Sequence, residues 1–218
     1  MPTTRGPYAK TARVRSGILD AAMEVFAETG YRATTMKEIA ERAGISQRGL
    51  VHHFANKAEL LAAVLEVREA QSALLMPPLG SSIDAFLGML EVVADNNLRP
   101  GLVELYSVLT AEGASPEHPG HEHFRERYDD LRNYFSVAFD ALREQGELES
   151  PLDSDQLAAG FVGLLEGLQV QWLYDRRTID LEPILRAFLT SIIPRYAELS
   201  AAAKVHEGER ALSTGSAE

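Results

Sequence analysis

A short segment near residue 50 carries several hydrogen-bond donors and no acid. The donors within residues 46–54 are Gln47, Arg48, His52 and His53. Helical spacing predicts that Leu50, Val51 and Phe54 face inward. The donors then face outward together with Gly49. Acceptors for such donors line the DNA major groove, where base edges and phosphates surround an inserted helix. The residue types therefore indicate a surface that reads double-stranded DNA.

The residues just before this segment predict a second helix and a tight turn. Apolar side chains recur at helical spacing, at Met36, Ile39, Ala40 and Ala43. Thr35 and Glu38 form a capping box at the start of this helix, and Gly44 supplies the left-handed residue that ends it. Ser46 can cap the helix that follows. The sequence therefore predicts a helix–turn–helix over residues 35–54.

For each of these residues we weigh a predicted contact with DNA against an ordinary role on the surface or in packing. Arg48 can pair with a guanine edge, or it is a solvated surface arginine. Gly49 is costly inside a helix, so it either permits close approach to the groove or is merely tolerated. We expect one of the two histidines to reach the DNA backbone. The alternative for His53 is that its side chain packs beneath the helix.

Lys57 and Thr35 are candidate phosphate contacts outside the recognition segment. Lys57 follows the predicted cap Asn56 and lies in the first turn of a helix, where the helix dipole disfavours a cation. A phosphate beside it would remove this conflict; the alternative is a free surface lysine. Thr35 can cap its helix and donate its backbone amide to a phosphate at the same time. The candidate DNA-binding residues are Thr35, Ser46, Gln47, Arg48, Gly49, His52, His53 and Lys57.

Charge is unevenly distributed along the chain. The 218 residues carry 21 Lys and Arg against 32 Asp and Glu, a net charge of −11. Residues 1–57 contain nine basic and five acidic side chains, a net of +4, so the remaining residues carry −15. A basic N-terminal part joined to an acidic remainder is typical of a local DNA-binding module.

Composition limits where the protein is expected to work. The chain has no cysteine, which suits a reducing compartment and excludes disulfides and thiolate chemistry. It has no apolar run of about 18 residues, and no apolar stretch follows the basic N-terminus. We therefore expect no membrane span, no secretory signal and a cytoplasmic location.

The rest of the sequence also reads as helices, and we predict an all-α fold of about nine helices. Besides the helix–turn–helix, the predicted helices cover 10–29, 57–76, 83–96, 101–113, 121–146, 155–175 and 181–199. Breaks rich in Pro, Gly and Asn separate them. Residues 1–8 and 201–218 are expected to be loose ends.

Residues 18–61 strongly resemble the N-terminal domain of the tetracycline-repressor-type (TetR) transcription regulators. The shared features are G-Y-x-x-T-T, I-A-x-x-A-G-I-S, the H-F pair and the following K-x-x-L. The chain departs from many members at Val51-His52, where they carry aromatic residues. The resemblance covers about residues 12–72 and implies a DNA-binding domain there. It further implies that residues 73–200 bind an effector and dimerise, with 201–218 as a tail.

A small organic effector is implied by the same resemblance. Apolar walls with a few polar groups would suit it, and such side chains lie on the helices of the second domain. The candidates are Met89, Tyr106, Leu109, Phe135, Phe139, Gln169, Trp172 and Tyr174. Ordinary core packing is the alternative for each of them.

Two helices near the C-terminus have the features of a subunit interface. Three glycines in 155–175 follow helical spacing, and a close helix–helix crossing would explain these costly residues. The segment 181–199 carries a broad apolar stripe. The candidate interface residues are Gly160, Phe161, Gly163, Leu164, Gly167, Leu168, Leu185, Phe188, Leu189 and Ile192. They could build a four-helix interface on a two-fold axis, giving a homodimer; burial within one subunit is the alternative.

A metal site or an enzyme finds less support. His118, His121 and His123, with Glu117 and Glu122, include competent metal ligands. Their spacing lacks the i, i+4 pair of a helical site, so we predict a solvated loop and neither metal nor cofactor. The sequence has no G-x-S-x-G elbow, phosphate-binding glycine loop, dinucleotide fingerprint or H-E-x-x-H motif, so no enzyme is predicted.

The expected function is that of a homodimeric DNA-binding regulator. One recognition helix reads few bases, whereas two related by symmetry read a palindrome. We expect a repressor that binds a palindromic operator and is released by a small effector. The alternatives are a ligand-independent regulator, an activator of the same fold, and a helical interaction protein that does not bind DNA.

Overall fold

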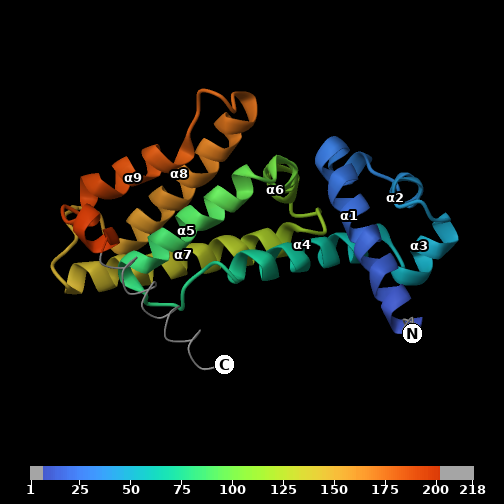
Figure 1. The fold of residues 1–218 in the computed structure, drawn as a ribbon, viewed down its shortest axis with the longest axis horizontal. Helices are drawn as coiled ribbons and strands as arrows, with labels where there is room; N and C mark the ends of the chain where they lie inside the picture. Colours follow the sequence, from blue (N-terminus) through green and yellow to red (C-terminus); the bar gives the residue numbers. More distant parts are fainter. Residues whose placement is uncertain (1–6, 202–218) are drawn as a thin grey trace, which may run out of the picture. The chain divides into compact units, whose positions relative to one another are not determined.

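The computed structural model describes residues 7–201, and these residues form helices and connecting turns without a strand (Figure 1). The helices are α1 (Pro7–Ala33), α2 (Met36–Arg42), α3 (Gln47–His53), α4 (Lys57–Ala73), α5 (Ser82–Asn97), α6 (Pro100–Gly113), α7 (His121–Glu144), α8 (Ser154–Tyr174) and α9 (Leu181–Ile192). The all-α prediction is therefore confirmed. The expected loose segments 1–8 and 201–218 lie almost entirely outside the described residues. In the part that is described, no helix has the length and apolarity needed to cross a membrane.

The helices form two compact units. The head unit runs up to Ala73 and includes Arg99–Arg125, and the body unit comprises Leu74–Leu98 and the described residues from Glu126. The sequence predicted a single boundary near residue 72. The division differs because Leu105 and Leu109 of α6, with Phe124 of α7, pack into the same core as α1 and α4.

α1 supplies the central face of the head unit. Its buried side chains follow helical spacing and include Ile18, Leu19, Ala22, Val25 and Phe26. These side chains share one core with Leu60, Leu61 and Val64 of α4. Gly30 interrupts α1 with a φ of 77°, close to the predicted helix end, and one further helical turn follows it.

The starts of α2 and α3 are capped as the sequence predicts. The Oγ1 atom of Thr35 accepts a hydrogen bond from the Glu38 amide at 3.2 Å, and the Thr35 amide donates to the Glu38 carboxylate at 2.7 Å. The Oγ atom of Ser46 accepts from the Gly49 amide at 3.1 Å. Each cap satisfies amides that the first turn of a helix leaves unpaired.

The turn between α2 and α3 closes with a left-handed glycine. Gly44 has a φ of 67°, and its amide donates to the Glu41 carbonyl at 3.1 Å. The amide of Ile45 donates to the Ala40 carbonyl at 3.0 Å. This pair of bonds is the Schellman closure, which ends a helix and redirects the chain. The predicted helix–turn–helix is therefore confirmed, and Figure 1 shows α2 and α3 following α1.

The body unit is built around four phenylalanine rings from α5, α7 and α8. Phe86, Phe135, Phe139 and Phe161 are fully buried, and the contacting pairs have ring centroids 4.6–5.5 Å apart. α9 packs on α5 and α8. The helix predicted over 181–199 is wrong in its length, because α9 ends at Ile192 and a short helix at 196–201 follows. Pro194 lacks the amide that a continuous helix requires.

Candidate nucleic-acid interface

The outer surface of α3 presents most of the predicted donors. Three of them, Gln47, Arg48 and His52, are exposed, whereas His53 is half-buried. The buried side chains of Leu50 and Phe54 fix the orientation of the helix and turn this surface outward. α3 contains no acidic side chain. The surface can therefore donate hydrogen bonds to base edges and attract phosphates without an internal acid that competes for them.

The prediction that Val51 faces inward is wrong. Its side chain is 45% exposed, whereas the neighbouring Leu50 is fully buried. α3 has only seven residues and contacts the core along the narrow stripe of Leu50 and Phe54, which are four positions apart. A residue one position further along a helix is rotated by about 100°, so Val51 lies beyond the edge of that stripe.

The arginines of the head unit differ in their partners. Arg42 donates to Glu24 at 2.9 Å and to Glu28 at 2.8 Å, and these bonds raise the pKa of its guanidinium. The guanidinium of Arg15 lies 4.8 Å from the centre of the Phe54 ring. Arg48 forms no hydrogen bond or ion pair with any described residue. Of these three guanidinium groups, that of Arg48 is fully available to a ligand.

Thr35 has a different use for its backbone amide than the sequence suggested. We expected this amide to reach a phosphate while the side chain capped α2. Instead, both the amide and the hydroxyl donate to the Glu38 carboxylate, at 2.7 and 2.8 Å. These bonds lower the pKa of Glu38, which stays charged and completes the capping box. In this structure Thr35 holds the start of α2 and has no free amide for a phosphate.

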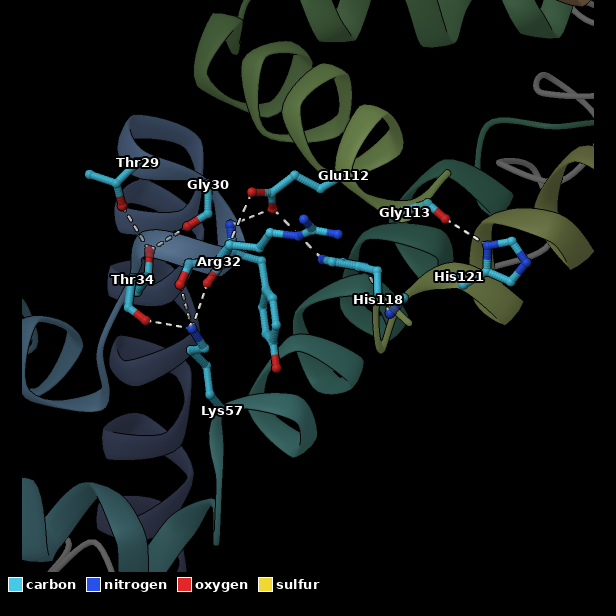
Figure 2. Close-up of polar contacts among 11 residues, drawn as sticks. Thr29, Gly30, Arg32, Thr34, Lys57, Glu112, Gly113, His118 and His121 are labelled. Carbon is cyan, nitrogen blue, oxygen red and sulfur yellow. Dashed lines mark hydrogen bonds and ion pairs between the residues drawn. The ribbon is translucent and has the colours of Figure 1, made fainter. Parts of the chain in front are cut away.

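Lys57 also has partners that the sequence did not indicate. Figure 2 shows its ammonium group among three backbone carbonyls that follow the interruption of α1. It donates to Tyr31 and Thr34 at 2.6 Å each and to Arg32 at 3.3 Å. These carbonyls are the unpaired end of a helix, where a cation is favoured. The unfavourable position of Lys57 at the start of α4 is therefore compensated within the protein, so phosphate is not needed to explain it.

Glu112, at the end of α6, holds the same turn from its amide side. Its carboxylate accepts from the amides of Tyr31 at 2.7 Å and Arg32 at 3.4 Å (Figure 2). Glycine suits position 30 because its φ of 77° strains other residues, and a Cβ added there would lie 2.8 Å from Oε1 of Glu112, which would have to shift. We call Lys57 and Glu112, with the segment 30–34 that they hold, the α1–α2 clamp. It fixes the backbone that leads directly into α2.

His118 packs beside the clamp. Its ring lies edge-on to Tyr31, with centroids 4.9 Å apart, and Nδ1 accepts from the Gly120 amide at 3.1 Å. The buried Nε2 atom has no hydrogen-bond partner and lies 3.7 Å from the carboxylate of Glu112. The pKa of His118 is lowered, chiefly because the ring is buried. The negative charge of Glu112 raises this pKa, whereas the positive charges of Arg32, His121 and Lys57 lower it further. The neutral ring is the form that this position favours.

The candidate metal ligands in this loop have structural roles. His118 is buried as described, and a ring nitrogen of His121 is 2.8 Å from the Gly113 carbonyl. His123 lies 3.5 Å from the carboxylate of Glu69. Among the described residues, no group of three or more His, Asp or Glu side chains is arranged to hold a metal ion.

The candidate effector residues are divided between the two units. Leu109 is fully buried in the head-unit core, and the hydroxyl of Tyr106 donates to Glu69 at 3.1 Å. The remaining six belong to the body unit, where Met89, Phe135, Phe139 and Trp172 are buried and Gln169 is half-buried. Tyr174 is 90% exposed in the single chain, so it does not line an enclosed cavity within one subunit.

The candidate interface residues fall into an outer and an inner group. Gly160, Gly163 and Gly167 are exposed on α8, and a Cβ added to any of them would meet no atom of the described residues within 4 Å beyond the nearby backbone of its own helix. Leu164, Phe188 and Ile192 are half-buried. The inner group is buried within its own unit and comprises Phe161, Leu168, Leu185 and Leu189. These four side chains pack inside one subunit. The exposed glycines and the three half-buried side chains form the outer group, which is available to a second copy.

The head unit also contains contacts that reasoning from the sequence missed. Glu112 binds the amides of Tyr31 and Arg32, about 80 positions away in the chain, and no local sequence pattern predicts such a contact. An open depression of about 520 Å³, lined by Arg32, Ala111, Glu112 and Ser115, lies beside the clamp. The strongest available signal was the glycine at position 30, which marks a place where another group approaches the backbone closely.

Two family models match the chain. The model described as bacterial regulatory proteins of the tetR family matches residues 18–64. The model described as the C-terminal part of BetI-type transcriptional repressors matches residues 89–204. The first match covers α2 and α3 with their flanking helices, and the second covers most of the body unit.

Individual proteins and structures are similar over different lengths. The chain is 30% identical over 173 residues to the HTH-type transcriptional regulator SrpR of Pseudomonas putida, across 78% of this chain and 79% of that protein. It is 52% identical over 52 residues, 24% of each chain, to the transcriptional activator FasR of Mycolicibacterium smegmatis. In fold it resembles SmeT, the repressor of the Stenotrophomonas maltophilia multidrug efflux pump SmeDEF, in its complex with triclosan. The TM-score is 0.68 at 23% identity, over 83% of this chain and 92% of SmeT.

Proposed function

The chain belongs to the tetR family of bacterial transcriptional regulators, and we propose that it is a cytoplasmic repressor that binds a palindromic operator as a homodimer and leaves it when a small organic effector binds. The observation that carries this proposal is the exposed, acid-free surface of α3 with the unpaired guanidinium of Arg48. Such a surface matches the hydrogen-bond acceptors that base edges present in a major groove.

On DNA, the residues of α3 divide by the groups they can reach. Arg48 and Gln47 are exposed on the outer surface and donate to base edges, with Arg48 suited to guanine. His52 and the half-buried His53 reach phosphates, while Ser46 and Gly49 let the start of α3 approach the groove closely. Thr35 and Lys57 act indirectly, because their donors already hold the backbone around α2.

The proposed homodimer uses the outer surface of α8 and α9. Glycine lowers the stability of a helix by about 1 kcal/mol relative to alanine, and no contact with residues 7–201 explains the three exposed glycines of α8. A close crossing with the α8 of a second copy would explain them. Ile184 is 39% exposed on α9 and extends the same apolar face. Two helices from each chain then form a four-helix interface on a two-fold axis.

Release by an effector requires two states of the dimer. The effector can shift their equilibrium only as far as its affinity differs between them. The proposed binding residues are the apolar Met89, Phe135, Phe139 and Trp172, with Gln169 as a polar group. Triclosan, the ligand bound to SmeT, is a suitable first probe of this binding chemistry.

The direct test is selection of DNA by the full-length protein from a library of random-sequence duplexes. We expect one enriched sequence with two inverted half-sites, whose centres lie about 34–36 Å apart or at a multiple of that spacing. We refer to it below as the selected duplex. A library that stays random after repeated selection at moderate salt would contradict the proposal. Triclosan should then lower the affinity for the selected duplex, as measured by fluorescence anisotropy.

A further inference from the structure

Val51 is an apolar side chain on the surface that we propose for DNA. Among the described residues of the head unit, it is the one large hydrophobic residue that is largely exposed to solvent, at 45%. An isolated exposed valine is ordinary on a protein surface. Here its position matters, because it lies on the seven-residue helix α3, among the exposed donors Gln47, Arg48 and His52.

The neighbours of Val51 on this face are the residues that donate. Side chains three and four positions apart lie next to each other on a helix. Val51 therefore lies beside Arg48 and Gln47, both exposed, and directly precedes the exposed His52. Valine is also a poorer helix former than the straight-chain residues. Its presence at an exposed position of α3 thus favours neither folding nor solubility.

The chemistry of a base edge gives this side chain a role. In the major groove, thymine presents one acceptor and a methyl group on C5, and the methyl group is recognised by apolar contact. Valine cannot donate a hydrogen bond, so thymine is the base whose edge it matches. A donor such as Arg48 on the same face suits guanine instead.

We infer that Val51 is a specificity-determining residue that contacts the C5 methyl group of a thymine in each half-site. This inference rests on the proposed function and adds to it one base identity that the donors cannot read. It predicts a thymine within a few base pairs of the guanine read by Arg48, at symmetric positions of the selected duplex.

The test replaces each thymine of the selected duplex by deoxyuridine, one symmetric pair at a time. This change removes only the methyl group and leaves base pairing intact. For the wild-type protein, one pair should weaken binding by about fourfold per half-site, as expected for one buried methyl group. The Val51→Ala variant should bind the thymine and deoxyuridine duplexes with nearly equal affinity. Gln47→Ala is the matched control, because it alters the same face and should keep the thymine preference.

The outcomes separate this inference from the proposed function. If the wild-type protein selects no sequence, the proposed function fails. If it selects one but no thymine substitution changes its affinity, or Val51→Ala keeps the wild-type thymine preference, the inference about Val51 is overturned. Because Val51 is exposed, its replacement should leave the helical circular dichroism spectrum and the thermal midpoint unchanged. A folded variant therefore gives a clear answer in either direction.

Discussion

At the scale of single residues, two arginines of the head unit differ in whether their guanidinium groups have partners. The guanidinium of Arg42 is held by two carboxylates and cannot reach a ligand without breaking those bonds. The guanidinium of Arg48, six positions later, has no partner among the described residues. A group without competing acids loses less on binding a base edge, and for this reason we assign base reading to Arg48.

Replacing Arg48 by alanine should weaken binding to the selected duplex by about 1–3 kcal/mol per half-site, the usual size of one bidentate contact to guanine. Binding to random DNA should change less, because that binding depends mainly on phosphates. Fluorescence anisotropy on both duplexes at one salt concentration measures the difference. Arg42→Ala is the control, since exposed ion pairs contribute little to stability. Equal losses on both duplexes would show that Arg48 contacts only the backbone.

His118 should make the stability of the protein depend on pH. Its pKa is below the ordinary value of 6.5 in the folded state, chiefly because the ring is buried. In the unfolded chain the ring binds a proton more readily, so stability is present above pH 6.5 and is lost as pH falls towards the lowered pKa. The free energy of unfolding, measured in urea between about pH 7 and pH 5, should fall more steeply for the wild type than for His118→Gln. The same slope in both proteins would contradict this assignment.

At the scale of secondary-structure elements, the α1–α2 clamp positions the recognition helix. Lys57 comes from α4 and Glu112 from α6, and together they hold the carbonyls and the amides of one turn. Opposite charges on opposite sides of a backbone segment restrict it more than either could alone. α2 begins at Met36, four positions after Arg32, so the clamp determines where α2 and α3 start.

The Lys57→Met variant distinguishes this positioning role from a phosphate contact. Loss of the ammonium group leaves three carbonyls without their donor, which should cost about 1–3 kcal/mol of stability. Chemical denaturation measures this loss. The slope of log affinity against log salt should stay unchanged, since a phosphate contact would contribute close to one unit per lysine. Normal stability with a reduced slope would instead restore the phosphate contact that the sequence suggested.

The elements that sequence predicts well are those whose bonds are local. The caps of α2 and α3 join residues three positions apart, and Gly44 ends α2 within one turn. The end of α9 was predicted wrongly, at residue 199, although Pro194 disfavours a continuous helix there. The clamp was not predicted at all, since it joins residues about 80 positions apart. Val51 was misplaced because helical periodicity does not tell how narrow the buried stripe of a seven-residue helix is.

At the scale of the whole molecule, the central question is how two copies meet. A Gly163→Arg variant places a charged side chain on the exposed face of α8, where a Cβ would meet no other part of the described chain within 4 Å. We expect the fold to persist and the dimer to dissociate, as measured by sedimentation velocity. Gly101→Arg is the matched control, because position 101 is equally open and lies on α6. A Gly163→Arg protein that remains dimeric would place the interface elsewhere.

Charge at the same scale explains how an acidic protein can bind DNA. The net charge is −11, but residues 1–57 carry +4. Over distances longer than about 8–10 Å, salt screens the acidic remainder from the DNA. The basic N-terminal part therefore governs the encounter, and affinity should fall as the salt concentration rises.

The measurement that tests the account most directly is the ratio of affinities for the selected duplex and for a scrambled duplex of the same composition, at one salt concentration. A regulator that reads bases through α3 should prefer the selected duplex by at least about a thousandfold. The Arg48→Ala and Val51→Ala variants should lower that ratio while retaining the wild-type fold. A wild-type ratio near one would contradict sequence-specific recognition by this surface.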